Sequence, residues 1–235
     1  MLTKNIKFKK FIIKSKNYNT KSIYKNMIRN YRNGHLKLLS CLSKNYKYSY
    51  DKKLIKKYKK YLNFRIIGMG GSILGAEAIY QFLKHKIKKN FFFLNNLEKK
   101  FNLLKKEKDI VNLIISKSGN TLETISNSNI VIKNNKKNII ITENKKNYLN
   151  DLANNIKAEV VEHKNYIGGR YSVLSEVGML PAELMGLKEN NFKRLNHLIR
   201  NKKFVDQLIR NVSCTLELLK KGKYLSVILN YDHKS

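Results

Sequence analysis

A short turn rich in hydroxyl groups carries the clearest chemical signal in this sequence. The turn consists of nine residues, Ser116-Lys117-Ser118-Gly119-Asn120-Thr121-Leu122-Glu123-Thr124, which we call the phosphate cup. The apolar, β-branched run Val111–Ile115 before it predicts a buried strand, and the amphipathic stretch Leu122–Ile132 predicts a helix. Where a parallel strand passes into a helix, free backbone N–H groups and the helix dipole favour an anion. Side-chain hydroxyls add donors and Gly119 permits a tight turn, so the residues predict a site for a phosphate monoester.

A second turn, Gly68-Met69-Gly70-Gly71-Ser72, is also placed between an apolar run and a helical pattern. Glycines serve any tight strand-to-helix turn, so alone this turn is weak evidence for a ligand. It is not a dinucleotide fingerprint, because Gly75 falls four residues after Gly71 and no acidic residue ends the next strand. It is not a Walker loop either, because the Gly-Lys-Ser/Thr ending is missing. Together with the phosphate cup, it gives two hydroxyl-bearing loops at adjacent strand ends.

A third turn, Gly168-Gly169-Arg170-Tyr171-Ser172, can be interpreted in two ways. One interpretation is a helix-entry turn with Ser172 as N-cap and Arg170 on the surface. In the other, the glycines let the backbone approach a ligand and Arg170 presents a fixed, always-charged fork. After two phosphate-type loops, Arg170 becomes a candidate for stabilising oxyanion charge that develops in a reaction.

Strand patterns alternate with helical patterns through the middle of the chain. The predicted strands are Phe64–Ile67, Phe91–Leu94, Val111–Ile115, Asn138–Thr142 and Glu159–Val161, and the predicted helices are Ile73–Lys84, Leu122–Ile132 and Tyr148–Ile156. This alternation indicates an α/β fold in three αβα layers, with a parallel sheet between helices. Phosphate ligands bind such sheets at the carboxyl ends of the strands, where the first two turns fall.

The flanking segments suggest three divisions of the chain: a helical segment over 1–62, an α/β domain with the phosphate cup over 63–200, and an incomplete second domain over 201–235. Pro181 is expected in the first turn of a helix over Ala182–Leu187. A further helix is predicted at Phe204–Lys220. A new strand at Tyr224–Leu229 would open the second domain, because no helix follows it before Ser235.

The composition is strongly basic, with 49 Lys and Arg against 16 Asp and Glu and a net charge of +33. Such a charge suggests a nucleic-acid partner. The lysines are spread along the whole chain among asparagine, isoleucine and tyrosine, which is typical of a codon bias acting on a tolerant surface. The run Tyr46–Tyr50, with lysines continuing to Lys60, resembles a single-strand binder in composition. We favour a lysine-rich helical face whose tyrosines pack inward.

Two cysteines, Cys41 and Cys214, have no metal-type spacing and indicate reduced thiols rather than a disulfide framework. No apolar run approaches the roughly 20 residues that span a bilayer. Phe11-Ile12-Ile13 is too short for the core of a signal peptide. These features predict a soluble, cytoplasmic protein with no membrane partner.

In order and spacing, the three turns resemble motifs of the glucose-6-phosphate isomerase family. The matching residues are Ile67–Ser72, Ser116–Thr124, Gly168–Ser175 and Val177–Ala182. The resemblance covers roughly residues 60–190, the first sugar-isomerase (SIS) domain of that family, and continues more weakly to 235. It implies aldose–ketose interconversion of glucose 6-phosphate and fructose 6-phosphate.

The resemblance also assigns roles to individual residues. Ser72, Ser116, Ser118, Thr121 and the backbone N–H of Lys117 would hold the phosphate, Gly71 and Gly169 would contact the sugar, and Arg170 would stabilise the cis-enediolate intermediate. Proton transfer between C1 and C2 places negative charge on oxygen, which a preplaced guanidinium can meet. The resemblance implies no metal or redox cofactor, and a homodimer for the full-length family. We expect no nucleic-acid partner, because we attribute the lysine excess to codon bias.

One part of the family's machinery has no counterpart in this sequence. The carboxylate base, the ring-opening histidine and a late lysine belong to motifs of the family's second half. Glu123 is better read as a first-turn helix carboxylate, Glu176 and Glu183 as solvent-facing or packing residues, and His163 and His233 as incidental. We therefore expect a truncated isomerase that is inactive alone. The alternatives are a non-catalytic SIS sugar-phosphate sensor, a bifunctional glucose/mannose phosphate isomerase, and a polyanion-binding protein.

Overall fold

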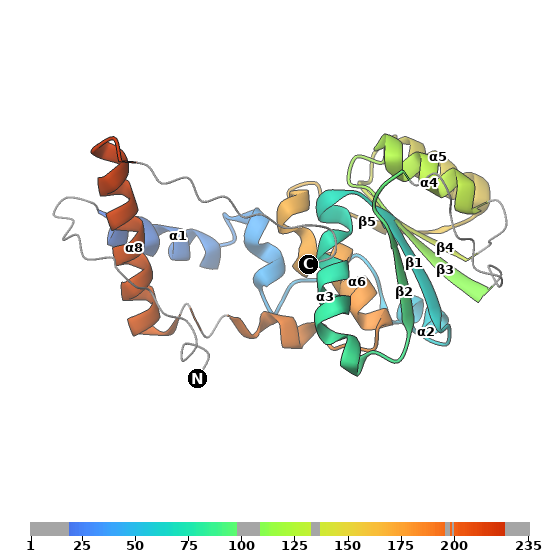
Figure 1. Cartoon of the computed structure of the whole chain (residues 1–235), viewed down its shortest axis with the longest axis horizontal. Coiled ribbons are helices and arrows are strands. Elements are labelled where there is room, and N and C mark those ends of the chain that lie inside the picture. The colour runs from blue at the N-terminus through green and yellow to red at the C-terminus, as the bar shows by residue number, and fades with distance from the viewer. Residues whose placement is uncertain (1–18, 98–108, 133–136, 196–197, 199, 224–235) are drawn as a thin grey trace. The chain divides into compact units, whose positions relative to one another are not determined.

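The computed structural model describes residues 19–97, 109–132, 137–195, 198 and 200–223 (Figure 1). The chain divides into two compact units. Residues Leu36–Arg194 form one, which we call the sheet unit; Met1–His35 and Leu195–Ser235 together form the other, the terminal unit. The three domains drawn from the sequence stay a prediction, and the strand expected at Tyr224–Leu229 lies outside the described residues.

A parallel sheet forms the centre of the sheet unit. Its five strands within the described residues are β1 (Asn63–Gly68), β2 (Asn90–Leu94), β3 (Ile110–Ile115), β4 (Asn138–Thr142) and β5 (Glu159–Glu162). The strands are ordered β2-β1-β3-β4-β5, and every neighbouring pair is parallel. Every residue of β3 and β4 is buried, which is typical of a parallel sheet covered on both faces. The predicted α/β fold is therefore confirmed.

Helices cover the two faces of the sheet in separate layers (Figure 1). The helices of the sheet unit are α2 (Lys52–Tyr58), α3 (Leu74–Leu83), α4 (Leu122–Ile132), α5 (Tyr148–Ile156) and α6 (Glu176–Leu184). On one face, Ile114 and Ile140 pack with Val131 of α4 and Leu149 of α5. On the other face, residues of α3 and α6 pack on alternate strand positions such as Leu113. The period of two along each strand sends its side chains to opposite faces.

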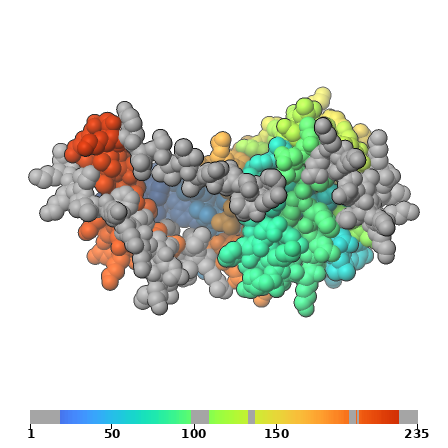
Figure 2. Space-filling view, viewed as in Figure 1, coloured from blue at the N-terminus to red at the C-terminus, as the bar shows by residue number. Residues whose placement is uncertain are grey.

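The outer face of α3 reaches the surface of the sheet unit (Figure 2). Leu74 and Phe82 on this helix are 51% and 81% exposed, whereas Ala76 and Ile79 are buried. The helix thus buries one stripe against the sheet and leaves apolar groups on the opposite side.

The segment before β1 differs from the predicted helical face. Helix η1 (Lys37–Leu42) and α2 flank the run Tyr46–Tyr50, which itself is not helical. Its tyrosines do pack inward as predicted: the rings of Tyr48 and Tyr50 stack with centroids 5.1 Å apart. The Tyr50 hydroxyl donates to Glu183 at 2.8 Å. The helical part of the prediction is confirmed over Lys52–Tyr58, where α2 carries four of the lysines, and is wrong over Tyr46–Tyr50, whose tyrosines occur at every second position.

Two further local predictions need correction. Pro181 lies inside α6, which begins at Glu176, and not in the first turn of a separate helix over Ala182–Leu187. Ser172 is not a helix N-cap: it lies in helix η5 (Gly169–Leu174), and its hydroxyl donates to the carbonyl of Gly169 at 2.7 Å. The cap of α6 is Ser175, whose hydroxyl accepts from the N–H of Val177.

The terminal unit pairs helices that are remote in sequence. In it, α1 (Thr20–Arg32) lies beside α8 (Lys202–Lys220), and the buried hydroxyls of Thr20 and Ser213 are 2.7 Å apart. Within the described part of the chain, no helix has the length and apolar character needed to cross a membrane.

Candidate functional site: a phosphate cup at the switch point of the sheet

The first two turns of interest meet at the point where the sheet reverses its strand order. From β1 the chain passes through α3 to β2 on one side, and β3 then adds on the other side of β1. Gly68 at the end of β1 pairs with Ile115 at the end of β3. The loops that follow therefore begin side by side at one edge of the sheet. In open α/β sheets this switch point is where ligands bind.

Hydroxyl groups line the phosphate cup that follows β3. The hydroxyls of Ser116 and Thr121 are 2.9 Å apart. The N–H of Gly119 donates to the Ser116 hydroxyl at 3.2 Å, and the N–H of Asn120 donates to the Ser118 hydroxyl at 3.3 Å. Gly119 has a φ of +71°, a left-handed conformation that glycine adopts without strain.

The cup also presents backbone donors. No acceptor among the described residues takes the N–H groups of Lys117, Ser118 or Thr121. The first N–H groups of α4, which starts at Leu122, have no partner within the helix by geometry. The Thr124 hydroxyl is buried and has no partner in the described part of the chain. Converging donors at a helix N-terminus suit an oxyanion such as phosphate.

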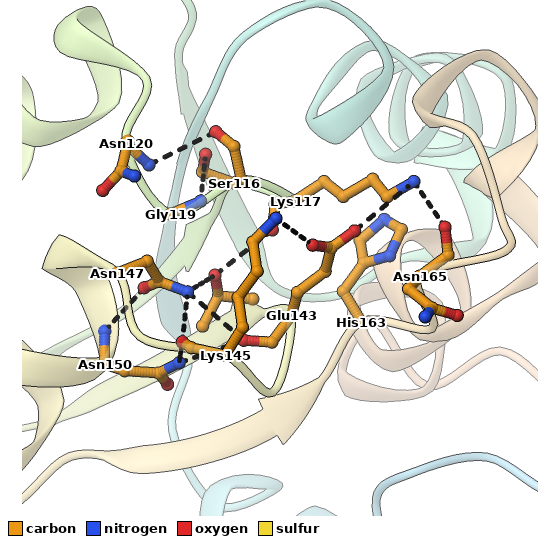
Figure 3. Close-up of polar contacts among 12 residues, drawn as sticks. Ser116, Lys117, Gly119, Asn120, Glu143, Lys145, Asn147, Asn150, His163 and Asn165 are labelled. Carbon is orange, nitrogen blue, oxygen red and sulfur yellow. Dashed lines mark hydrogen bonds and ion pairs between the residues drawn. The ribbon is translucent and has the colours of Figure 1, made fainter.

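A neighbouring loop, Glu143–Asn147 between β4 and α5, holds the cup in place (Figure 3). The Glu143 N–H donates to the Lys117 carbonyl at 3.1 Å. The Asn147 amide donates to the Thr142 hydroxyl and to the Glu143 carbonyl, both at 3.3 Å. Asn147 also packs directly on the cup, because a Cβ added at Gly119 would lie 2.1 Å from its Oδ1. Sequence reasoning missed both residues; their position after a buried strand, at the carboxyl edge of the sheet, was the available signal.

Charges beside the cup are mutually compensated. The Glu143 carboxylate lies 3.5 Å from the ammonium of Lys117 and 2.5 Å from that of Lys145. Burial alone would raise the pKa of Glu143, but the bond and charge of Lys145, with Lys117, outweigh it and hold the pKa below its ordinary 4.5. His163 is 2% exposed, and burial lowers its pKa below the ordinary 6.5. An ionised Glu143 therefore faces a neutral histidine near pH 7.

The turn with the arginine packs against the glycine turn after β1. The Ser172 hydroxyl donates to the Gly71 carbonyl at 3.2 Å. A Cβ at Gly71 would lie 2.1 Å from the carbonyl oxygen of Gly169, so only glycine allows this approach. Arg170 is exposed, and the described residues offer it no ion pair or side-chain hydrogen bond. Its guanidinium is thus available to a ligand beside Gly71, while Ser72 sits at the end of the same turn.

A hollow of about 740 Å³ opens next to this contact. Its walls include Gly71, Gly169 and Arg170, and most of the remaining lining is apolar, as with Leu74 and Phe192. None of the cup residues lines it. An apolar hollow offers few donors to a phosphate, so the cup is the better anion site on chemical grounds.

One of the carboxylates considered as a base, Glu176, is occupied by hydrogen bonds and remote from solvent. Glu176 is fully buried and accepts the Tyr46 hydroxyl at 2.9 Å and the Ser49 N–H at 3.0 Å. Glu176 is therefore a packing residue, in accord with the prediction, and Glu123 lies in the first turn of α4 as predicted. His233 lies outside the described residues.

Comparison with known proteins agrees with these motifs. The family model for phosphoglucose isomerase matches residues 49–221. The glucose-6-phosphate isomerase of Methanocaldococcus jannaschii is 32% identical over 206 residues, which is 77% of this chain and 49% of that protein. The enzyme of the same name from Acholeplasma laidlawii is 33% identical over 154 residues, 57% of this chain and 36% of that protein. The chain thus spans about half or less of the length of these relatives.

Among solved structures, a hypothetical protein from Thermus thermophilus, TT0462, has a similar fold. Its TM-score is 0.63 at 19% sequence identity, over 86% of this chain and 52% of that one. The C-terminal domain of glucosamine-fructose-6-phosphate aminotransferase from Francisella tularensis gives a TM-score of 0.50 at 11% identity, over 89% and 59% of the two chains. At these identities the likeness concerns the fold alone.

Proposed function

Because the chain belongs to the phosphoglucose isomerase family, we propose that it binds glucose 6-phosphate and fructose 6-phosphate as the substrate-holding half of an aldose–ketose isomerase. The observation that carries the proposal is the phosphate cup at the switch point of the sheet, with its converging hydroxyl and N–H donors. In this proposal Ser72, Ser116, Ser118, Thr121 and the N–H of Lys117 hold the phosphate.

The sugar would extend from the cup towards Gly71, Gly169 and Arg170. Isomerisation moves a proton between C1 and C2 and leaves negative charge on the enediolate oxygens. A guanidinium held beside the sugar stabilises that charge more in the transition state than in the substrate. The exposed Arg170, unpaired among the described residues, supplies such a group.

The proposal does not give the proton-transferring base to any described residue. Glu176 is held by hydrogen bonds from the Tyr46 hydroxyl and from the N–H and hydroxyl of Ser49, and His163 is buried. We therefore propose that these 235 residues alone bind the substrate without turning it over. An assay of fructose 6-phosphate formation from glucose 6-phosphate tests this, and measurable turnover by the chain alone contradicts it.

A non-catalytic sugar-phosphate sensor is the second candidate, and it is favoured by the burial of Glu176 and His163, whose side chains are already hydrogen-bonded. The isomerase and the sensor can be distinguished by adding the second half of a relative to this chain. If adding the C-terminal half of the Methanocaldococcus jannaschii protein to this chain produces isomerisation, the result supports the proposed isomerase function. Binding of the sugar phosphate with no activity in the combined protein favours the sensor. The homodimer implied by the family is tested separately by sedimentation of the same samples.

Binding itself is tested by calorimetry with fructose 6-phosphate. Ser116→Ala and Thr121→Ala each remove a hydroxyl donor to a charged ligand, and each is expected to weaken binding about tenfold. Thr215→Ala, which removes an exposed hydroxyl on α8, is the control and is expected to bind like the unaltered chain. Equal affinity in all four proteins would rule out the cup as the phosphate site.

A further inference from the structure

The side chain of Lys117 leaves the phosphate cup and contacts another segment. Its ammonium donates to the backbone carbonyl of Asn165 at 2.7 Å and lies 3.5 Å from the Glu143 carboxylate (Figure 3). Its own carbonyl accepts the N–H of Glu143 at 3.1 Å. The backbone of Lys117 thus belongs to the cup, while its charge is directed to the far side of the loop.

The segment that Lys117 reaches leads directly into the turn with the arginine. Asn165 lies three residues before Gly168. The segment is anchored on both sides of Asn165: the His163 N–H donates to the Thr142 carbonyl at 2.7 Å, and Ile167 is fully buried. A bond to the Asn165 carbonyl therefore ties the cup to the chain that carries Arg170.

The other end of the arginine turn is fixed by the glycine turn after β1. Ser172 donates to the Gly71 carbonyl at 3.2 Å, and Gly71 packs on Gly169. Arg170 is thus held between an anchor on the β1 loop and one on the β3 loop. The β3 anchor is the side chain of one residue, Lys117, whose ammonium Glu143 orients.

We propose that Lys117 is a positioning residue that sets the separation between the phosphate cup and the Arg170 guanidinium. The inference rests on the proposed function, because only a sugar phosphate spans both ends of the site. Inorganic phosphate occupies the cup alone, so its affinity does not depend on where Arg170 lies. A lysine suits the task because its flexible stem reaches across the loops and its ammonium makes a charge-assisted bond to a carbonyl.

The test compares two ligands, inorganic phosphate and fructose 6-phosphate, by calorimetry on the full chain. Lys117→Met is expected to lower the affinity for fructose 6-phosphate about tenfold and that for inorganic phosphate by no more than about twofold. Lys117→Arg restores a charged donor and is expected to recover most of the loss. Glu143→Gln removes the carboxylate charge that orients the Lys117 ammonium. It is expected to lower the affinity for fructose 6-phosphate selectively as well, but by a smaller factor.

Lys164→Met is the matched control, because it removes a nearby charge that pairs with Glu162 and not with the cup. It is expected to leave the ratio of the two affinities unchanged. An equal loss for both ligands in Lys117→Met, or no loss for either, overturns the positioning role. Should the unaltered chain bind neither ligand, the proposed function fails, and that failure is visible before any variant is made. If Lys117→Met unfolds by circular dichroism, Glu143→Gln and Lys117→Arg decide the question.

Discussion

Replacing Gly119 by alanine tests how tightly the β4–α5 loop braces the phosphate cup. Gly119 has a φ of +71°, so an alanine there would cost about 1 to 2 kcal/mol in left-handed strain. Its Cβ would also lie 2.1 Å from Oδ1 of Asn147 and 2.8 Å from its Cβ. Asn147 must then move, although it caps α5 through the N–H of Asn150 and donates to Thr142 and Glu143.

The second contribution to the loss of stability comes from the hydrogen bonds that Asn147 loses when it moves. An N-cap is worth about 1 kcal/mol, and each buried amide bond about as much again. With the strain, we expect Gly119→Ala to lower the free energy of unfolding by about 4 to 5 kcal/mol, a drop of roughly 15 °C in Tm. Urea denaturation followed by circular dichroism measures the first quantity, and a thermal melt measures the second.

Gly186→Ala is the matched control for this experiment. Gly186 has a φ of +91° and nothing within 4 Å of an added Cβ, so alanine there costs strain alone. Asn147→Gly in the Gly119→Ala background removes the clash. The double variant is expected to lose less free energy of unfolding than the sum of the losses of the two single variants. If Gly119→Ala destabilises no more than Gly186→Ala, the contact with Asn147 does not brace the cup.

Gly71→Ala forces apart the turns that meet at the Gly169 carbonyl, so calorimetry should show a loss of about tenfold or more in fructose 6-phosphate affinity; unchanged affinity would separate this contact from the site. Tyr46→Phe leaves buried Glu176 short of a donor and should lower the free energy of unfolding by about 1.5 to 3 kcal/mol in urea, whereas a neutral result would mean that water replaces the hydroxyl. The pKa of His163 is lower in the folded than in the unfolded chain, so the stability that the neutral histidine contributes is complete above pH 6.5 and falls as the pH drops towards the folded pKa. His163→Asn should therefore flatten the plot of the free energy of unfolding against pH below pH 6.5. An unaltered slope in that range would contradict this account of His163.

The strands and the helices around the sheet could be predicted from the sequence because their signals are local. The β-branched run at Val111–Ile115 became β3, one residue longer, and α4 and α5 have the predicted bounds. Pro181 misled the prediction, because a proline favours a first turn, yet α6 continues through it where packing on both sides buries the helix. Tertiary packing thus overrides a local rule at this position.

Residues that support the site from a distance in sequence could not be predicted in the same way. Glu143 and Asn147 occur in a stretch of Asn and Lys that looks like an ordinary solvent loop, and only the strand order brings it to the cup. Burial of Glu176 depends on donors from Tyr46 and Ser49, more than 120 residues away along the chain. No window of sequence contains both partners of such a contact.

A structure of this chain with fructose 6-phosphate tests the central claim most directly. The account predicts the phosphate within hydrogen-bond distance of the Ser116 and Thr121 hydroxyls, at the carboxyl ends of β1 and β3, with the sugar directed to Arg170. A phosphate held by lysines elsewhere on the surface, with the cup empty of ligand, would contradict it.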